Sequence, residues 1–272
     1  MKLQVGEISI AYDDLGPRTG LPVAFIHGFP FSREMWKRQV EALKEKFRVI
    51  TYDVRGHGES TAGDRQYTIE YFVDDLIALL DHLKIASVVG VGLSMGGYIL
   101  LRAVERHPER FRALVLCDTR SEPDNNEGRV RRAGQAKIVK SEGMKKFADE
   151  FLKAVFYHKT YESNPAAVES IRRIVEAADP LNVAATLIAL AARTDTTPAL
   201  YNIRVPTLIM VGQHDTLMPP SAAHDMKEKI PYAELHLIRK AGHVSNVENP
   251  AEFSERLLAF LRRLLSSSDS RP

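Results

Sequence analysis

The 272-residue sequence contains one cysteine and one tryptophan, and its charges nearly cancel. Cys117, as the only cysteine, cannot form an intrachain disulfide or contribute to a cysteine-rich metal site. It lies in the apolar run 113–117, so we expect it to be a buried hydrophobic residue. The net charge of +2 is too small to indicate a nucleic-acid-binding protein, because such proteins carry a strong positive field.

Long apolar runs are also missing from the sequence. No apolar stretch approaches the roughly 20 residues that a transmembrane helix needs. The first residues lack the apolar core of a secretory signal peptide. His-Glu-x-x-His and phosphate-loop patterns are absent too. The sequence therefore predicts a cytoplasmic protein that contacts neither a membrane nor nucleic acid and uses no metal and no cofactor.

Short apolar segments alternate with amphipathic ones along much of the chain. The apolar, β-branched segments predict strands at 8–12, 23–26, 48–52, 87–91, 112–116, 205–211 and 234–238. The helical periodicities between them predict helices at 32–44, 68–83, 98–107, 221–230 and 250–265. Ser32 and Thr68 are the expected N-caps of the first two helices, and 266–272 is expected to be a disordered tail. Wholly apolar strands separated by helices indicate an α/β fold with a mostly parallel central sheet flanked by helices.

Residues 120–197 interrupt this alternation. They show no convincing strand pattern, but they contain three stretches of helical periodicity: 144–155, 168–175 and 181–192. We interpret 120–197 as a helical insertion at the carboxyl edge of the strands, where loops build functional sites. The core domain is then formed by 1–119 together with 198–272.

The segment Gly92-Leu-Ser-Met-Gly96 lies between an expected strand and an expected helix. A sharp strand-to-helix turn of this pattern strains the serine backbone and holds the hydroxyl outward, and it needs glycines where neighbouring backbone passes too close for a Cβ. Ser94 is therefore a candidate nucleophile. The pattern by itself is equally consistent with a flexible turn.

A serine nucleophile needs a base to take its proton and a carboxylate to orient that base. In a hydrolase of this type the partners follow in the order serine, acid, histidine, each after a later strand. Asp215 follows the strand predicted at 205–211, and His243 follows the strand predicted at 234–238. We therefore predict a catalytic triad of Ser94, His243 and Asp215.

Other residues compete for these two roles. Asp118 directly follows the strand that ends at Cys117, so its carboxylate could reach the same histidine, although we favour Asp215. Asp215 is also consistent with a simple turn residue before two prolines. His214 neighbours the proposed acid, but its place in the strand-end turn does not fit the base. His57 lies in a segment that suggests an exposed loop.

Hydrolysis also requires N–H donors for the oxyanion of the tetrahedral intermediate. One donor is expected to be the backbone N–H of Met95, since it follows the nucleophile and begins a helix whose dipole favours negative charge. The other is expected from the loop His27-Gly-Phe-Pro30, where the N–H of Phe29 is the natural donor. His27 is expected to order this loop rather than to perform chemistry.

In combination, several segments resemble the α/β-hydrolase superfamily over nearly the whole chain: His27-Gly-Phe-Pro30, Asp53-Val-Arg-Gly-His-Gly-Glu-Ser60, Gly92-Leu-Ser-Met-Gly96, the strand before Asp215, and 241–250. Residues 117–123 and the helical insertion resemble the branch that contains 3-oxoadipate enol-lactonases and small carboxylesterases. The resemblance implies that 120–197 is a cap that covers the nucleophile and largely sets substrate choice. It also implies that Asp53, Arg55 and His57 are structural. Similar enzymes that open epoxides or displace halide carry aspartate where this chain has Ser94.

The expected activity is hydrolysis of carboxylic esters or lactones of small, moderately apolar substrates through an acyl-enzyme. Alternatives with the same triad are a 3-oxoadipate enol-lactonase, a C–C bond hydrolase and a perhydrolase. An alternative of another class is a slow-turnover ligand-binding or signalling protein on the same fold. Candidate apolar pocket residues are Phe29, Phe147, Phe151 and Leu187. Phe156, Tyr157 and Leu190 are further apolar candidates from the insertion, although most of these side chains are expected to pack in its own core. Candidates for binding a substrate carboxylate are Arg120, Arg129, Arg131 and Arg132, although a solvated helix face is the simpler interpretation for most of them.

Overall fold

The computed structural model describes residues 1–268, and its eight strands form one sheet in the order β1-β2-β4-β3-β5-β6-β7-β8. The strands are β1 (Lys2–Val5), β2 (Ile8–Leu15), β3 (Pro22–Ile26), β4 (Arg48–Tyr52), β5 (Val88–Leu93), β6 (Phe111–Cys117), β7 (Thr207–Gly212) and β8 (Ala233–Ile238). The β1–β2 and β2–β4 pairs are antiparallel, and the other five pairs are parallel. The prediction of a mostly parallel α/β sheet is confirmed.

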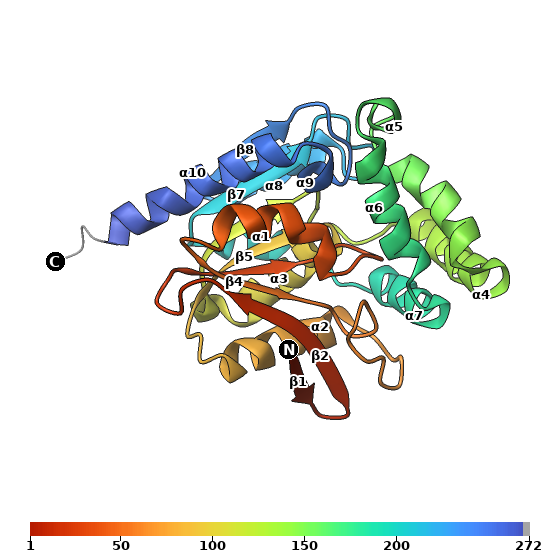
Figure 1. Cartoon of the computed structure of the whole chain (residues 1–272), viewed down its shortest axis with the longest axis horizontal. Helices are drawn as coiled ribbons and strands as arrows, with labels where there is room; N and C mark the ends of the chain where they lie inside the picture. Colours follow the sequence, from red (N-terminus) through yellow and green to blue (C-terminus); the bar gives the residue numbers. More distant parts are fainter. Residues whose placement is uncertain (269–272) are drawn as a thin grey trace.

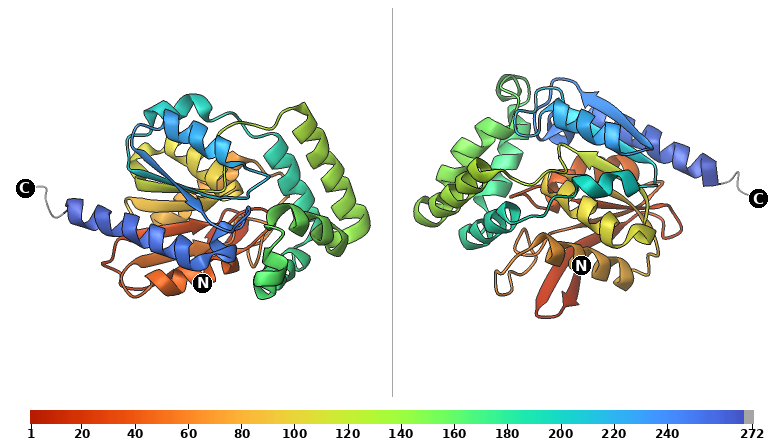
Figure 2. Two further views of the ribbon diagram at one scale, coloured as in Figure 1. Left: turned by 90° about the horizontal axis from the view of Figure 1, so that it is seen from above. Right: turned by 180° about the vertical axis from the view of Figure 1, so that it is seen from behind.

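Helices cover both faces of this sheet. In Figures 1 and 2, α1 (Lys37–Leu43) and α10 (Pro250–Ser268) lie on one face. The opposite face carries α2 (Ile69–His82), α3 (Met95–Arg106) and α8 (Pro220–Lys229). All residues of β4, β5 and β7 are buried, as is typical of parallel strands between two helical layers. Cys117 is also fully buried, as expected.

Two local predictions from the sequence need correction, and one strand has no counterpart among the predicted ones. The helix expected at 32–44 begins as a 3-10 turn, η1 (Arg33–Trp36), and the Ser32 side chain caps nothing. The reason is that the Ser32 carbonyl accepts the N–H of Met35, while the N–H of Arg33 is bound by Asp53. Strand β1 was not predicted, because its side chains alternate between exposed and half-buried at the sheet edge. The tail expected from 266 is helical through Ser268, and 269–272 lie outside the described residues.

The second expected cap is confirmed at Thr68, whose hydroxyl accepts the N–H of Tyr71 at 3.1 Å. That bond satisfies one of the free amides in the first turn of α2.

The segment between β6 and β7 is helical. It contains α4 (Asn126–Val155), α5 (Thr160–Ser163), α6 (Pro165–Glu176), α7 (Pro180–Ala191) and the 3-10 turn η3 (Thr197–Asn202). Helices α4 to α7, drawn in green to teal, gather beside one end of the sheet in Figures 1 and 2. Helix α4 breaks at Gly143, where φ is 80° and ψ is 178°, a conformation essentially restricted to glycine. The division into a core of 1–119 with 198–272 and a cap of 120–197 remains a prediction.

Within residues 1–268, no single helix has the length and hydropathy to cross a membrane. Helices α6 and α7 reach that composition only as a pair, and the two are bent by 97° relative to each other.

Candidate active site

Ser94 occupies the sharp turn between β5 and α3. Its φ of 53° and ψ of −110° are strained for a residue with a side chain, and its N–H donates to the carbonyl of Cys117. A Cβ at Gly92 would lie 2.4 Å from the carbonyl oxygen of Gly96, and one at Gly96 would lie 2.2 Å from that of Ile26. Only glycine fits at these two positions, so the pattern around Ser94 reflects close backbone packing rather than flexibility.

The structure brings the three predicted triad side chains together. The Oγ of Ser94 lies 2.9 Å from Nε2 of His243, and Nδ1 of His243 lies 2.8 Å from Oδ2 of Asp215. The other carboxylate oxygen of Asp215 accepts the N–H groups of Leu217 and Met218, each at 2.9 Å. A carboxylate can only accept, so Nδ1 of His243 donates to it and Nε2 is left to accept the hydroxyl proton of Ser94.

The electrostatics of the site favour a basic histidine. Burial disfavours the charged imidazolium, but the facing carboxylate of Asp215 outweighs this and raises the pKa of His243 above its usual range. The carboxylates of Asp118 and Glu248 act on His243 in the same direction. An imidazolium at His243 is therefore stabilised by its surroundings.

This arrangement predicts the acid limb of a pH–rate profile. If neutral His243 is the base, kcat/KM falls as the pH drops through its folded-state pKa, which lies above the ordinary histidine value of about 6.5. We expect half of the maximal kcat/KM on a neutral ester at a pH above that value. The check is a kcat/KM profile from about pH 5 to about pH 9, with the fold monitored by circular dichroism. An acid limb centred at or below about pH 6.5 contradicts the assignment.

The rival acid, Asp118, is fully buried but makes different contacts. Its Oδ1 accepts the N–H of Gly212 at 2.8 Å, and its Oδ2 accepts the hydroxyl of Ser245 at 2.5 Å. Burial and the negative charge of Asp215 raise its pKa well above the usual range. The carboxylate bonded to His243 is that of Asp215, so the geometry favours Asp215 as the acid.

The two residues expected to supply the oxyanion donors lie at the same cavity as Ser94. Met95 is the first residue of α3, and Phe29 lies in the loop after β3. Both residues line the cavity beside Ser94. Within residues 1–268, neither backbone N–H donates a hydrogen bond to another group, so both are available to an oxyanion.

This cavity has a volume of about 240 Å³. Phe147 and Phe151 stack with ring centroids 5.2 Å apart, and Phe29 meets both rings edge-on. The three phenylalanines line the cavity as expected, together with Tyr98, Ile138, Leu190, Leu217 and Met218. Leu187, predicted to line the cavity, is fully buried and is not among the residues of its wall. That prediction is wrong because the face that α7 turns toward the cavity contains Leu190, not Leu187.

The charged part of the cavity wall holds more arginines than carboxylates. Arg120, Arg131 and Arg132 line it with Asp124 and Glu150, whereas Arg129 is exposed outside it. The carboxylate of Asp124 already forms ion pairs with Arg120 at 2.6 Å, with Arg132, and with Arg193 at 3.1 Å.

Neither Asp124 nor Arg193 stood out in the sequence, because no local pattern marks them. Burial lowers the pKa of Arg193, and its guanidinium stacks over the ring of Tyr98 at 4.2 Å. Because an arginine stays protonated even so, the Arg193 guanidinium places a positive charge directly behind the cavity wall.

A larger groove of about 640 Å³ lies elsewhere on the insertion. Its walls come from Arg65 and from α4 and α7, including Lys137, Lys140, Leu181 and Ile188. None of the three predicted triad residues lines it, whereas Ser94 and His243 line the smaller cavity.

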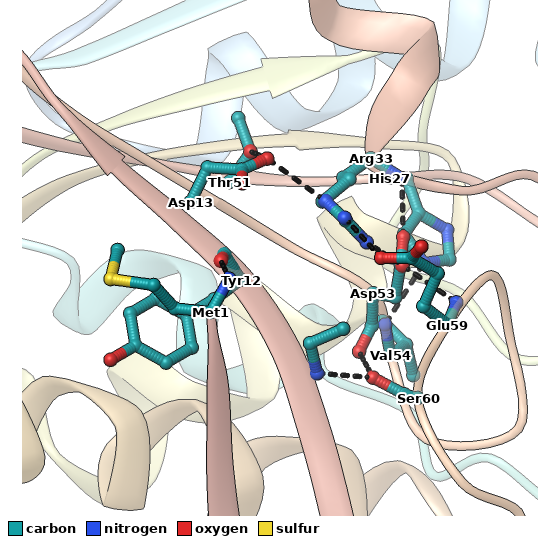
Figure 3. Close-up of polar contacts among 11 residues, drawn as sticks. Met1, Tyr12, Asp13, His27, Arg33, Thr51, Asp53, Val54, Glu59 and Ser60 are labelled. Atoms are coloured by element: carbon teal, nitrogen blue, oxygen red, sulfur yellow. Dashed lines mark hydrogen bonds and ion pairs between the residues drawn. The ribbon is translucent and has the colours of Figure 1, made fainter.

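The loop after β4 is held by a separate polar network, drawn in Figure 3. Arg33 forms ion pairs with Asp13, Asp53 and Glu59. His27 accepts the N–H of Val54 through Nε2, so Nδ1 carries its proton and donates to the carbonyl of Gly28. Burial lowers the pKa of His27 to about 4, so this histidine is neutral. These contacts order the loop that contains Phe29.

His57 and Arg55 also make structural contacts. Arg55 forms a two-pronged pair with Asp75 on α2. The expectation that His57 lies in an exposed loop is wrong: it is 2% exposed, packed edge-on against Phe29 and beside the ring of His27. Burial lowers its pKa to about 3. The His57 ring is buried because it packs against Phe29, although the loop around it is rich in glycine.

Among the described residues, no group of three or more His, Cys, Asp or Glu side chains is arranged to hold a metal ion.

Comparison with known proteins places this geometry in a family. The model of the alpha/beta hydrolase fold matches residues 22–250. A 3-oxoadipate enol-lactonase 2 of Acinetobacter baylyi is 28% identical over 261 residues, covering 96% of each chain.

Two solved structures are also similar. A thermophilic esterase from Thermogutta terrifontis, solved with malate bound, is 38% identical, with a TM-score of 0.92 over 97% of this chain and 98% of that one. An enol-lactonase from Burkholderia xenovorans is 32% identical, with a TM-score of 0.89 over 96% of this chain and 100% of that one. The chain belongs to the α/β-hydrolase family, in the branch of its enol-lactonases and esterases.

Proposed function

We propose that this protein is a serine hydrolase that cleaves carboxylic esters or lactones. The observation that carries the proposal is the hydrogen-bonded chain from Ser94 through His243 to Asp215, with Ser94 and His243 at the wall of a mostly apolar cavity. The enol-lactonases and esterases among the similar proteins support the same class of substrate.

The proposed reaction has two steps. Ser94 Oγ attacks the carbonyl carbon while Nε2 of His243 takes the hydroxyl proton, and the resulting oxyanion accepts the N–H groups of Met95 and Phe29. The imidazolium then donates its proton to the leaving alcohol oxygen, which leaves an acyl group on Ser94. Water, deprotonated by His243, attacks this ester, and the acid departs as Ser94 regains its proton. Asp215 stays ionised and stabilises the imidazolium throughout.

Turnover of 4-nitrophenyl butyrate tests this proposal against the slow-turnover alternative. A hydrolase releases nitrophenol in large excess over enzyme, whereas a binding or signalling protein on the same fold gives a single burst or none. The assay measures nitrophenol released per active site over a full progress curve. Release that stops at or below one equivalent contradicts the proposed function.

The cavity wall favours, as a second candidate, a substrate that carries its own carboxylate, such as the enol lactone of a dicarboxylic keto acid. Three arginines but only two carboxylates line the wall, and Arg193 adds a cation behind it. Among the described carboxylates, none forms an ion pair with Arg131, so its guanidinium is available to an anionic group.

Arg131→Gln tests this preference. We expect kcat/KM on 4-nitrophenyl hydrogen glutarate to fall about five-fold, since a partly exposed ion pair contributes up to ~1 kcal/mol. The loss should lie in KM, and kcat/KM on neutral 4-nitrophenyl butyrate should not change. Arg129→Gln, an exposed arginine of the same helix outside the cavity, is the matched control. Equal effects on both esters contradict carboxylate binding at Arg131.

A further inference from the structure

Asp118 is a buried carboxylate that the proposed reaction does not use. It follows β6 with a φ of 46° and has no exposed surface. Its backbone N–H donates to the carbonyl of Met210, which holds it against β7. Burying a carboxylate costs free energy unless every oxygen is bonded, and here both oxygens accept a hydrogen bond. If the position had only a packing role, an apolar residue would fill it at a lower cost in free energy.

The two partners of Asp118 belong to the two loops that carry the acid and the base. Gly212, whose N–H it accepts at 2.8 Å, ends β7 three residues before Asp215. Ser245, whose hydroxyl it accepts at 2.5 Å, follows His243 by two residues and begins α9 (Ser245–Glu248). One side chain on a third strand therefore ties both loops together.

The remaining contacts of these loops do not duplicate this bridge. The N–H of His214 donates to the carbonyl of Ala241, which joins the two loops through backbone alone. The N–H of His243 donates to the carbonyl of Val155, which joins the histidine loop to α4. The N–H of Gly242 donates to Glu248 of α9, within the segment that carries the histidine itself. Asp118 is the side chain that reaches both loops from the sheet.

We propose that Asp118 is a positioning residue. It fixes the loop of Asp215 against the loop of His243, so that the imidazole stays aligned between the Asp215 carboxylate and the Ser94 hydroxyl. The inference rests on the proposed function, because it concerns the geometry of that triad. Asp118 does not line the cavity, so its effect is on the reacting geometry rather than on substrate binding.

The chain offers variants that separate this role from others. Asp118→Asn keeps both bonds: its amide oxygen accepts the N–H of Gly212, and its NH₂ donates to the Ser245 hydroxyl oxygen once that hydroxyl turns. Asp118→Ala removes both bonds, and Ser245→Ala removes one. Asp225→Asn, an exposed aspartate on α8, is the control for loss of a negative charge.

The experiment measures kcat and KM on 4-nitrophenyl butyrate for these variants, with circular dichroism to confirm folding. We expect Asp118→Ala to lower kcat about 100-fold, as misplacement of a reacting group by about 1 Å does. KM should stay within about three-fold, because the cavity wall is unchanged. Ser245→Ala should show an intermediate loss, and Asp118→Asn should restore most of kcat.

A proton NMR signal gives a readout that does not depend on turnover. The Nδ1–H of His243, bonded to Asp215, should give a downfield resonance in wild type and in Asp118→Asn. In Asp118→Ala the resonance should broaden or disappear. If Asp118→Ala does not fold, Ser245→Ala carries the same test.

The outcomes test the positioning role of Asp118 and the proposed hydrolase function separately. Wild-type kcat and an intact resonance in Asp118→Ala overturn the positioning role. An Asp118→Asn variant as inactive as Asp215→Asn also overturns it, because Asp118 would then act as the acid. The proposed function fails independently if Ser94→Ala retains turnover, whatever the Asp118 variants do.

Discussion

Ser94→Ala is expected to lower kcat/KM on 4-nitrophenyl butyrate by about 10⁴–10⁶-fold, leaving only the catalysis that the oxyanion donors and substrate binding provide. The reason is geometric: Ser94 Oγ is the hydroxyl that lies 2.9 Å from the basic nitrogen of His243. The substitution removes one oxygen atom from a residue that is 8% exposed, and alanine retains the Cβ that the turn already accommodates. Loss of activity is therefore expected without loss of fold.

The matched control for this result is Ser221→Ala, which removes an exposed hydroxyl at the start of α8 and should retain wild-type kcat/KM. Steady-state kinetics on both variants, with thermal unfolding as a check on the fold, gives the comparison. Turnover by Ser94→Ala within about ten-fold of wild type would mean that another group is the nucleophile.

Asp215→Asn is expected to lower kcat by about 10⁴-fold while the protein stays folded. The N–H groups of Leu217 and Met218 both point at Oδ1 of Asp215, so the amide oxygen of asparagine must occupy that place. Its NH₂ group then faces Nδ1 of His243 and donates to it. The imidazole is forced into the tautomer with its proton on Nε2, which cannot accept the proton of Ser94.

Asp118→Asn is the control that shows whether the loss of activity in Asp215→Asn is specific to the acid. The two variants make the same chemical change at buried carboxylates beside the same histidine, so a large loss in Asp215→Asn alone identifies the acid. Kinetics on 4-nitrophenyl butyrate at a pH above the acid limb measures both. Equal losses, or a larger loss in Asp118→Asn, contradict the assignment of Asp215.

The strands and the spacing of the triad could be predicted from sequence because their signals are local. A wholly apolar segment such as 88–93 has few alternatives to a buried strand, and strands β2 to β8 were all expected. The residues at the ends of β5, β7 and β8 then converge on one edge of a parallel sheet, since parallel strands end on the same side. Ser94, Asp215 and His243 come within hydrogen-bonding distance of one another for this reason.

The features of the site that could not be predicted from the sequence depend on contacts between distant segments. Helical periodicity within α7 does not show which face meets the cavity, so the sequence offers both Leu187 and Leu190 although only Leu190 lines it. The ion pair of Asp124 with Arg193 joins positions far apart in the chain. The bridge from Asp118 to Ser245 spans 127 residues. None of these contacts leaves a periodic or motif-like trace, because each is set by how the insertion and the strand-end loops pack in three dimensions.

The measurement that tests the central claim most directly is covalent trapping of the nucleophile. The enzyme is treated with diethyl 4-nitrophenyl phosphate, which phosphorylates an activated serine, and is analysed by intact-mass and peptide mass spectrometry. We predict one diethylphosphoryl group per chain, located on the peptide that contains Ser94, and no adduct on Ser94→Ala. An adduct on a different residue, or equal labelling of Ser94→Ala, would contradict the assignment of Ser94 as the nucleophile.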